Sequence, residues 1–341
     1  MRHTPARRLW ATLLALLVVV SGPVVTGSAS AAAPRPLAAP GDTGDEGGTK
    51  SLTDALDAAS RGFVDARDAL ARSKQRQRDL AAALQRLDAE LGPRQAALDE
   101  IVAQSYRTGR LGPMSAMLGA SDSGTLLDRA DALQSVAIRQ DEAMRDLKQT
   151  RDGQAQAKLA IDATIRDQQK QLNVMARRKA QAEAALKAAG GGQDAEGPSG
   201  GNSTKSATAP SNLGTGCTVD DPTTTGCITP RLLFAMQQAK AAGFTHFVAC
   251  FRHQSFGEHP KGRACDFAAD KGGFGGVASG ASRTYGDRLA NFFIGNADRL
   301  NVLYVIWFRR IWLPSSGWKA YTRGNGDPSS DHTNHVHLSV R

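Results

Sequence analysis

The sequence lacks a hydrophobic run long enough to hold the protein permanently in a membrane. Its most apolar run, residues 9–20, is interrupted by Ser21, Gly22 and Pro23, short of the roughly 20 apolar residues that span a bilayer. Arginines precede the run and small residues follow it, which is typical of a cleavable secretory signal. We therefore predict a signal peptide at 1–33, a disordered tether at 34–50, and a secreted, extracellular protein.

A strong charge of one sign is also missing from the mature chain. The net charge of the whole sequence is +9, and it falls when Arg2, Arg7 and Arg8 leave with the signal peptide. Such a moderately basic balance favours either an ordinary solvated surface or attraction to an anionic polymer outside the cell. Export excludes nucleic acid as an expected partner.

Cysteine is absent from the first 216 residues, and all four cysteines follow at Cys217, Cys227, Cys250 and Cys265. An even number of cysteines in an exported protein implies a disulfide framework. Four cysteines can pair in three ways. Pairing of cysteines that are close in sequence favours Cys217 with Cys227 and Cys250 with Cys265. A catalytic thiol at Cys265 is the alternative, which oxidising conditions disfavour.

Residues 51–188 carry two long runs of apolar residues at alternating spacings of three and four, separated by a segment rich in glycine. This pattern predicts an antiparallel coiled-coil hairpin of two long helices, which would serve as a spacer or lever. Apolar residues at its turn have no core to enter and predict a docking site for a membrane-complex partner. They are Leu111, Met114, Met117 and Leu118.

The hairpin also resembles a known class of coiled coil. The segment Y-R-T-G-R-L-G-P-M at 106–114 stands between long heptad arms behind a signal peptide. In this it resembles the coiled-coil regions of exported cell-wall hydrolases that are regulated by the division transporter complex. The resemblance implies that the hairpin positions or regulates a hydrolase.

The composition changes twice more along the chain. Residues 189–215 are rich in glycine, serine and threonine, which predicts a flexible linker, and 216–341 have the size of a domain with its own core. A cap residue, a proline and a glycine stop predict a helix from Thr229 to Gly243. Further patterns predict strands at 245–252, 264–268, 302–308 and 336–340 and a helix at 285–300. The expected fold is multidomain: the helical hairpin, then a small α+β domain with an antiparallel sheet.

Histidine is scarce before this domain, since six of the seven histidines follow residue 240. His259, Gly262, Ala264 and Asp266 stand as H-x-x-G-x-A-x-D, and His335 and His337 stand as H-x-H. Catalytic zinc sites use three protein ligands, with imidazole nitrogen and carboxylate oxygen among the usual donors. The pattern predicts a Zn²⁺ site formed by His259, Asp266 and His337, with Gly262 turning the backbone between the first two.

The two motifs resemble those of the zinc peptidases of the D-alanyl-D-alanine carboxypeptidase and hedgehog superfamily, over about residues 245–341. The resemblance implies that His337 is a ligand and that His335 acts as an acid/base or oxyanion partner. The carboxypeptidases have a glutamate base three residues before the last ligand, where this chain has Asn334, and Asp331 stands where the hedgehog group has an acidic residue. The implied activity is zinc-dependent cleavage of amide bonds in peptidoglycan peptides, with His335 or Asp331 taking the proton. The resemblance therefore also implies that the secreted protein is associated with the cell wall.

Three further side chains are candidates for binding substrate. Arg252 and Arg263 can bind a carboxylate, although surface salt bridges explain Arg263 equally well, and Trp312 can line a groove. Three other functions remain open from the sequence. They are a non-catalytic, zinc-stabilised binding module for the cell wall, favoured by the missing glutamate, a coiled-coil activator of another hydrolase, and a peptidase that uses Cys265.

Overall fold

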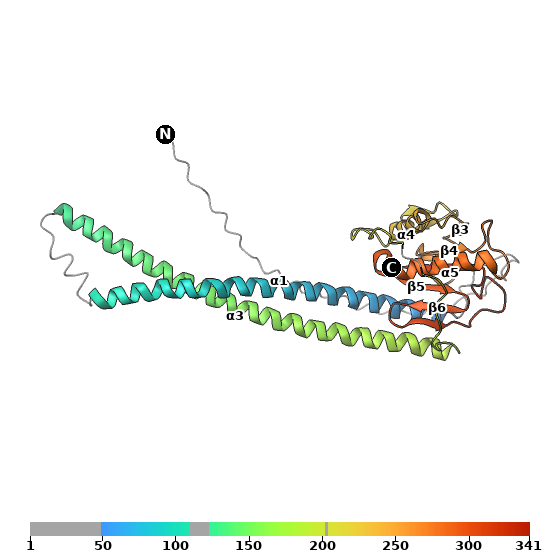
Figure 1. Ribbon diagram of the computed structural model, residues 1–341, viewed down its shortest axis with the longest axis horizontal. Helices are drawn as coiled ribbons and strands as arrows, with labels where there is room; N and C mark the ends of the chain where they lie inside the picture. The colour runs from blue at the N-terminus through green and yellow to red at the C-terminus, as the bar shows by residue number, and fades with distance from the viewer. Residues whose placement is uncertain (1–48, 109–122, 202–203) are drawn as a thin grey trace, which may run out of the picture. The chain divides into compact units, whose positions relative to one another are not determined.

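The computed structural model describes residues 49–108, 123–201 and 204–341 (Figure 1). The expected signal peptide, most of the tether and the apolar residues of the hairpin turn lie outside these ranges. Two long helices come first, α1 (Lys50–Thr108) and α3 (Ser123–Ala188), and they contact each other as an antiparallel pair. This confirms the predicted helical hairpin. In the described part of the chain, no helix combines the length and the apolar character needed to cross a membrane.

The hairpin is packed most tightly near the ends that join the rest of the chain. Leu56, Ala59 and Leu186 are almost fully buried there, whereas Val102 and Leu127, far from that end, are exposed. A polar side chain between the two helices forms a hydrogen bond across the pair, because the Ser73 hydroxyl of α1 donates to the carbonyl of Thr164 in α3 over 3.2 Å. The stability of the hairpin is therefore concentrated at its base, next to the C-terminal domain.

Three helices belong to the C-terminal domain: α4 (Pro230–Ala241), α5 (Gly280–Gly295) and α6 (Ala297–Leu300). As predicted, Thr229 caps α4, and its hydroxyl accepts from the Leu232 amide over 3.1 Å. The single helix expected at 285–300 is wrong in its bounds. Helix α5 begins earlier, and the helix is interrupted at Asn296, between α5 and α6. The Asn296 side chain donates to the carbonyl of Phe292 and accepts from the amide of Ser206, in the segment before the domain.

The main sheet has six antiparallel strands in the order β3-β4-β8-β5-β6-β7. Two of its strands were not expected from the sequence, and β3 is shorter than the strand expected at 245–252. Cys217 and Cys227 lie in or beside a second sheet of two short strands, β1 (Val219–Asp220) and β2 (Cys227–Ile228). The strands of the main sheet are β3 (Val248–Ala249), β4 (Ala264–Ala268), β5 (Val302–Trp307), β6 (Arg310–Leu313), β7 (Gly317–Ala320) and β8 (His335–Val340).

The two faces of the sheet are covered by different parts of the chain. Side chains alternate along β8, so that Val336, Leu338 and Val340 enter the core formed with α4 and α5, and the histidines of the strand lie on the opposite face. On that face, Ile306 of β5 stands directly opposite His337. Ile306 belongs to a second core, which the sheet shares with the base of the hairpin: Leu52, Leu56, Ala59, Ala182, Leu186, Leu303, Tyr304, Ile311, Leu313 and Tyr321.

The segment that the sequence predicts to be a linker, 189–215, runs along the C-terminal domain. The amide of Ala320 donates to the carbonyl of Gln193 over 2.8 Å, which extends the edge of β7. Further along, the amide of Ser206 donates to the side chain of Asn296 over 2.9 Å. The segment 189–215 contributes backbone groups to both contacts, so its composition gave no sign of them.

Candidate metal centre

Three different backbone elements supply the side chains of the candidate metal centre. His259 opens a 3₁₀ turn (His259–Lys261), Asp266 lies in the middle of β4, and His337 lies in β8. Gly262 ends the turn in the left-handed conformation, with φ of 65°, and a Cβ atom there would stand 2.6 Å from the carbonyl oxygen of Cys227. Only glycine fits this position without strain, and its turn brings the chain from His259 into β4.

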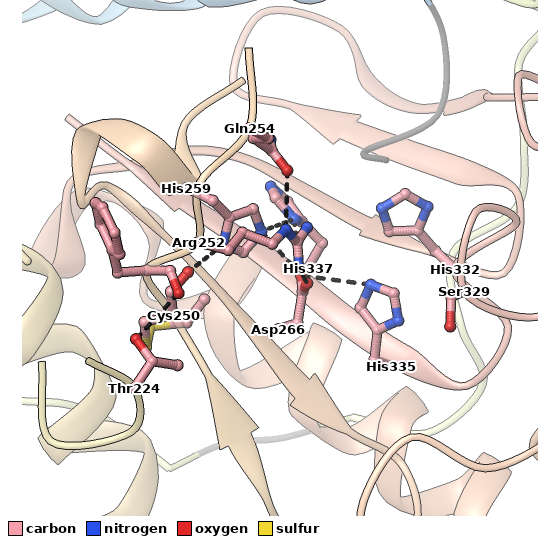
Figure 2. A network of polar contacts seen from close by, with 12 residues as sticks. Thr224, Cys250, Arg252, Gln254, His259, Asp266, Ser329, His332, His335 and His337 are labelled. Carbon is pink, nitrogen blue, oxygen red and sulfur yellow. Dashed lines mark hydrogen bonds and ion pairs between the residues drawn. A yellow bond between two sulfur atoms is a disulfide. The ribbon is translucent and has the colours of Figure 1, made fainter. Parts of the chain in front are cut away.

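The three side chains meet at one point (Figure 2). His337 Nδ1 lies 2.9 Å from Asp266 Oδ1, and His259 Nε2 lies 3.3 Å from both of these atoms. All three side chains are almost completely buried, with 0%, 1% and 0% exposure for His259, Asp266 and His337. Two imidazole nitrogens and a carboxylate oxygen at these separations can hold a metal ion.

Each of these side chains is held from behind by a second group. The carbonyl of Cys250 accepts from His259 Nδ1–H, which leaves the lone pair of Nε2 facing the centre. The Ser339 hydroxyl bonds His337 Nε2 over 2.9 Å, and Arg252 Nη1 donates to Asp266 Oδ2 over 2.6 Å. Such outer partners fix the tautomer and orientation of metal ligands. In each residue, the atom that points away from the centre is thus hydrogen-bonded. The three atoms that face the centre, the inner atoms, are His259 Nε2, Asp266 Oδ1 and His337 Nδ1, and they converge as a metal site requires.

Charge at the centre favours an anionic Asp266 and a neutral His332. Burial opposes ionisation of Asp266, but the adjacent imidazoles of His259 and His335 and the Arg252 guanidinium outweigh it and hold its pKa well below the ordinary value. Burial, then the neighbouring His335 and His337, lowers the pKa of His332 well below its ordinary value. A carboxylate that is ionised at neutral pH is suited to a cation.

His335 lies beside the three inner atoms, with Nε2 3.4 Å from Asp266 Oδ1. Its other nitrogen, Nδ1, lies 2.7 Å from Asn334 Oδ1. The Asn334 amide nitrogen donates to the Gly275 carbonyl and to the Ser329 hydroxyl, so the amide oxygen faces His335 and accepts from Nδ1–H. Asn334, which stands where the carboxypeptidases have a glutamate, therefore fixes the tautomer of His335 and leaves Nε2 as a proton acceptor.

The other predicted site residues are distributed differently. Arg252 lies at the centre, whereas Arg263 lies 3.6 Å from Glu258, on the far side of the turn. The Asp331 carboxylate accepts from Arg309 Nε over 2.8 Å. Trp312 pairs with Val305 of β5, one residue away from Ile306, so strand alternation places it on the opposite face of the sheet from His337. The structure does not bring Trp312 to the metal centre.

Several residues near the centre were missed by the sequence analysis. Tyr304 lies parallel to His337, with ring centroids 5.6 Å apart, and the His332 ring lies 4.8 Å from that of His335. The ring of Phe274, in the loop 269–279 between β4 and α5, lies 5.4 Å from that of His335. The period of two along β8 places Ser339 on the same face as His337 and could have identified it. The others come close only through the tertiary fold.

Both expected disulfides are present, Cys217–Cys227 and Cys250–Cys265. The possibility of a catalytic thiol at Cys265 is therefore wrong, because its sulfur is bonded to that of Cys250. The two disulfides indicate an extracytoplasmic protein.

Comparison with protein families gives one match in this part of the chain. Residues 224–336 match the family model of the VldE C-terminal domain. The matched segment includes His259 and Asp266 and ends one residue before His337. No curated protein and no solved structure matches the chain. Residues 224–336 are thus similar to the VldE C-terminal domain, the His/Asp/His group can hold a metal ion, and the match assigns the chain to no peptidase family.

Proposed function

We propose that this protein is an exported, metal-dependent hydrolase that cleaves amide bonds in the peptides of peptidoglycan. The observation that carries the proposal is the convergence of His259 Nε2, Asp266 Oδ1 and His337 Nδ1, each with its outer atom bonded to a second group. The two disulfides, which are typical of extracytoplasmic proteins, and the resemblance to zinc peptidases of the cell wall support peptidoglycan peptides as the substrate.

The donor set fits Zn²⁺, which binds imidazole nitrogen and carboxylate oxygen and keeps a fourth position in its catalytic sites. When bound, such an ion would polarise the scissile carbonyl and lower the pKa of a water molecule. The three residues would hold it, and Arg252, Ser339 and the Cys250 carbonyl would keep them in place. Zinc is part of the proposal, since the residues alone do not identify the metal.

His335 is the proposed proton acceptor. Its Nε2 faces the centre as an acceptor because Nδ1 keeps its proton and donates it in a hydrogen bond to Asn334 Oδ1. A group in this position can take a proton from the attacking water and return it to the leaving amine. Asp331 is less suited to the role, since its carboxylate is bound by Arg309. Arg252, with a fifth of its side chain exposed, is the proposed partner of a substrate carboxylate.

One observation favours a second function. Catalytic zinc sites keep an open coordination position, whereas structural sites are closed, and here His259 and His337 have no exposed surface. In a non-catalytic module of the cell wall, the metal would stabilise the fold and the domain would only bind wall peptide.

The two functions are distinguished by incubating the protein without residues 1–33 with purified peptidoglycan. Soluble fragments are analysed by mass spectrometry with zinc, with a chelator, and with zinc restored. A hydrolase releases fragments that disappear on chelation and return with zinc. His335→Ala should retain the metal and lose fragment release, and His259→Ala should lose both. Cosedimentation with peptidoglycan without any release would instead support the binding module.

A further inference from the structure

One cation from the helical hairpin reaches the turn that carries the metal ligand His259. Arg61 of α1 donates from Nη2 to Glu258 Oε2 over 2.7 Å, and its Nε lies 2.9 Å from Asp57 one turn earlier on the helix. Glu258 directly precedes His259. This contact joins residues that are 197 positions apart in the sequence.

Glu258 is itself a structural part of that turn. Its main-chain carbonyl accepts from the amides of Lys261 and Arg263 over 3.2 and 3.0 Å and so closes the turn around His259. Its side chain has no exposed surface, and a buried carboxylate is stable only when its charge is paired. Besides Arg61, Lys261 Nζ lies 2.7 Å away and Arg263 Nη1 lies 3.6 Å away. Among these contacts of Glu258, that of Arg61 comes from outside the C-terminal domain.

The packing beside this ion pair ties the hairpin to the same sheet face. Ile306 lies opposite His337 and belongs to the core that contains Leu56 and Ala59 of α1. Tyr304, in the same core, lies parallel to the ring of His337. The first turns of α1 thus border the metal centre both by charge, through Glu258, and by packing, through β5.

We propose that Arg61 is a positioning residue of the metal centre and that, through Glu258, the hairpin sets the geometry of the ligand His259. Without Arg61 the buried carboxylate loses its partner on α1. The turn then shifts relative to β4, and His259 Nε2 no longer keeps its place beside Asp266 Oδ1. The hairpin is accordingly a component of the metal centre rather than only a spacer. This inference rests on the metal binding of the proposed function, but not on hydrolysis.

The test measures metal affinity in the protein without residues 1–33. Zn²⁺ affinity is determined by competition with a chromophoric chelator, and Co²⁺ is used as a spectroscopic probe of ligand geometry. Removal of outer partners of metal ligands costs about 10- to 100-fold in affinity, and we expect Arg61→Gln to cause at least a 10-fold loss and an altered Co²⁺ spectrum. Arg61→Lys, which keeps the charge, should recover part of the affinity.

The matched control is Arg67→Gln. Arg67 lies on the same helix and pairs with Asp298 of the C-terminal domain, away from the turn at His259, so its loss should leave both metal signals unchanged. In a double-mutant cycle, adding Arg61→Gln to Glu258→Gln should cause little further loss. Helical content and melting temperature identify variants that fail to fold. If Arg61→Gln fails to fold, the metal affinity of Arg61→Lys is compared with that of the unsubstituted protein instead.

The outcomes separate this inference from the proposed function. If the unsubstituted protein binds no metal, the metal site is wrong and the inference falls with it. If it binds metal but releases no wall fragments, hydrolysis is wrong and the inference is still tested by affinity. If Arg61→Gln binds Zn²⁺ and Co²⁺ as Arg67→Gln does, Arg61 is an ordinary interface residue and the inference is overturned.

Discussion

Asp266 and His337 are directly paired residues of neighbouring strands, and His337 Nδ1 lies 2.9 Å from Asp266 Oδ1. Paired residues of adjacent antiparallel strands place their side chains on the same face of a sheet. The sheet register alone therefore brings together two of the three candidate ligands, and the turn at His259 needs only to supply the third.

Replacing Ser339 with alanine tests the support behind His337. The buried imidazole would lose the partner of its Nε2 atom, and we expect Zn²⁺ affinity to fall about 10-fold. The measurement is chelator competition, with Ser316→Ala, in the turn between β6 and β7, as the control. Equal affinities of the two variants would show that Ser339 does not orient the ligand.

Asn334→Ala tests how His335 is held. The imidazole would lose the acceptor that fixes its Nδ1–H tautomer, so we expect fragment release from peptidoglycan to fall at least 10-fold, by analogy with general acid–base contributions of about 10²–10⁴. Zn²⁺ affinity should stay the same, because Asn334 contacts none of the three inner atoms in the described contacts. A parallel loss of affinity would mean that Asn334 supports the metal site instead.

The two disulfides should differ in their effect on the metal. Cys250 supplies the carbonyl that holds His259, and Cys265 precedes Asp266, so replacing this pair with serine should lower Zn²⁺ affinity as well as stability, the latter by about 3 kcal/mol. The Cys217/Cys227 pair closes a loop in which neither cysteine bonds a ligand side chain. Its removal should lower the melting temperature with a smaller loss of affinity. The opposite order of affinities would contradict this assignment.

Asp221 makes stability depend on acid pH. Burial opposes its ionisation, but its carboxylate accepts hydrogen bonds from Thr223, Thr224 and the Phe251 amide, which lower its pKa below the ordinary value of 3.8. The stabilisation is therefore complete above about pH 4, and it is lost as the pH falls through the lower folded-state value. Asp221→Asn should lower the free energy of unfolding at pH 7 by about 2 kcal/mol, and the difference from the unsubstituted protein should shrink below pH 4.

Removing the hairpin should destabilise the C-terminal domain. In residues 216–341 alone, Leu303, Ile306, Ile311 and Leu313 would lose the apolar cover that Leu52, Leu56 and Leu186 provide, and each large apolar side chain left exposed costs about 1.5–3 kcal/mol. We expect a lower melting temperature and stronger binding of a dye for apolar surfaces than in residues 49–341. A domain that melts at the same temperature in both forms would show that the shared core contributes little.

The sequence predicted those parts of the fold that depend on local pattern. Heptad spacing predicted α1 and α3, and the cap at Thr229 predicted the start of α4. Among the candidate ligands, the motif spacing grouped His259 with Asp266, whereas the choice of His337 over His335 depended on the resemblance to the zinc peptidases, because both histidines lie on the same face of β8. Local loop closure was likewise enough to predict both disulfides.

Contacts between distant segments could not be predicted in this way. Strands β6 and β7 are short, and their pairing depends on neighbours in the sheet rather than on a strong pattern of their own. The segment 189–215 was predicted to be a flexible linker from its composition, which does not reveal that Leu56 of the hairpin shares a core with Ile306 of the sheet. Trp312 was grouped with the site on residue type, and the strand direction puts it on the other face.

The alternation in β8 restricts how this protein can evolve. Its odd-numbered residues His335, His337 and Ser339 face the metal centre, and its even-numbered residues fill the core. The loss or gain of one residue within the strand would exchange the two sets, so that imidazoles would enter the apolar interior and valines would face the metal. A single substitution in β8 affects either the core or the site, whereas an insertion or deletion there would disrupt both in one step.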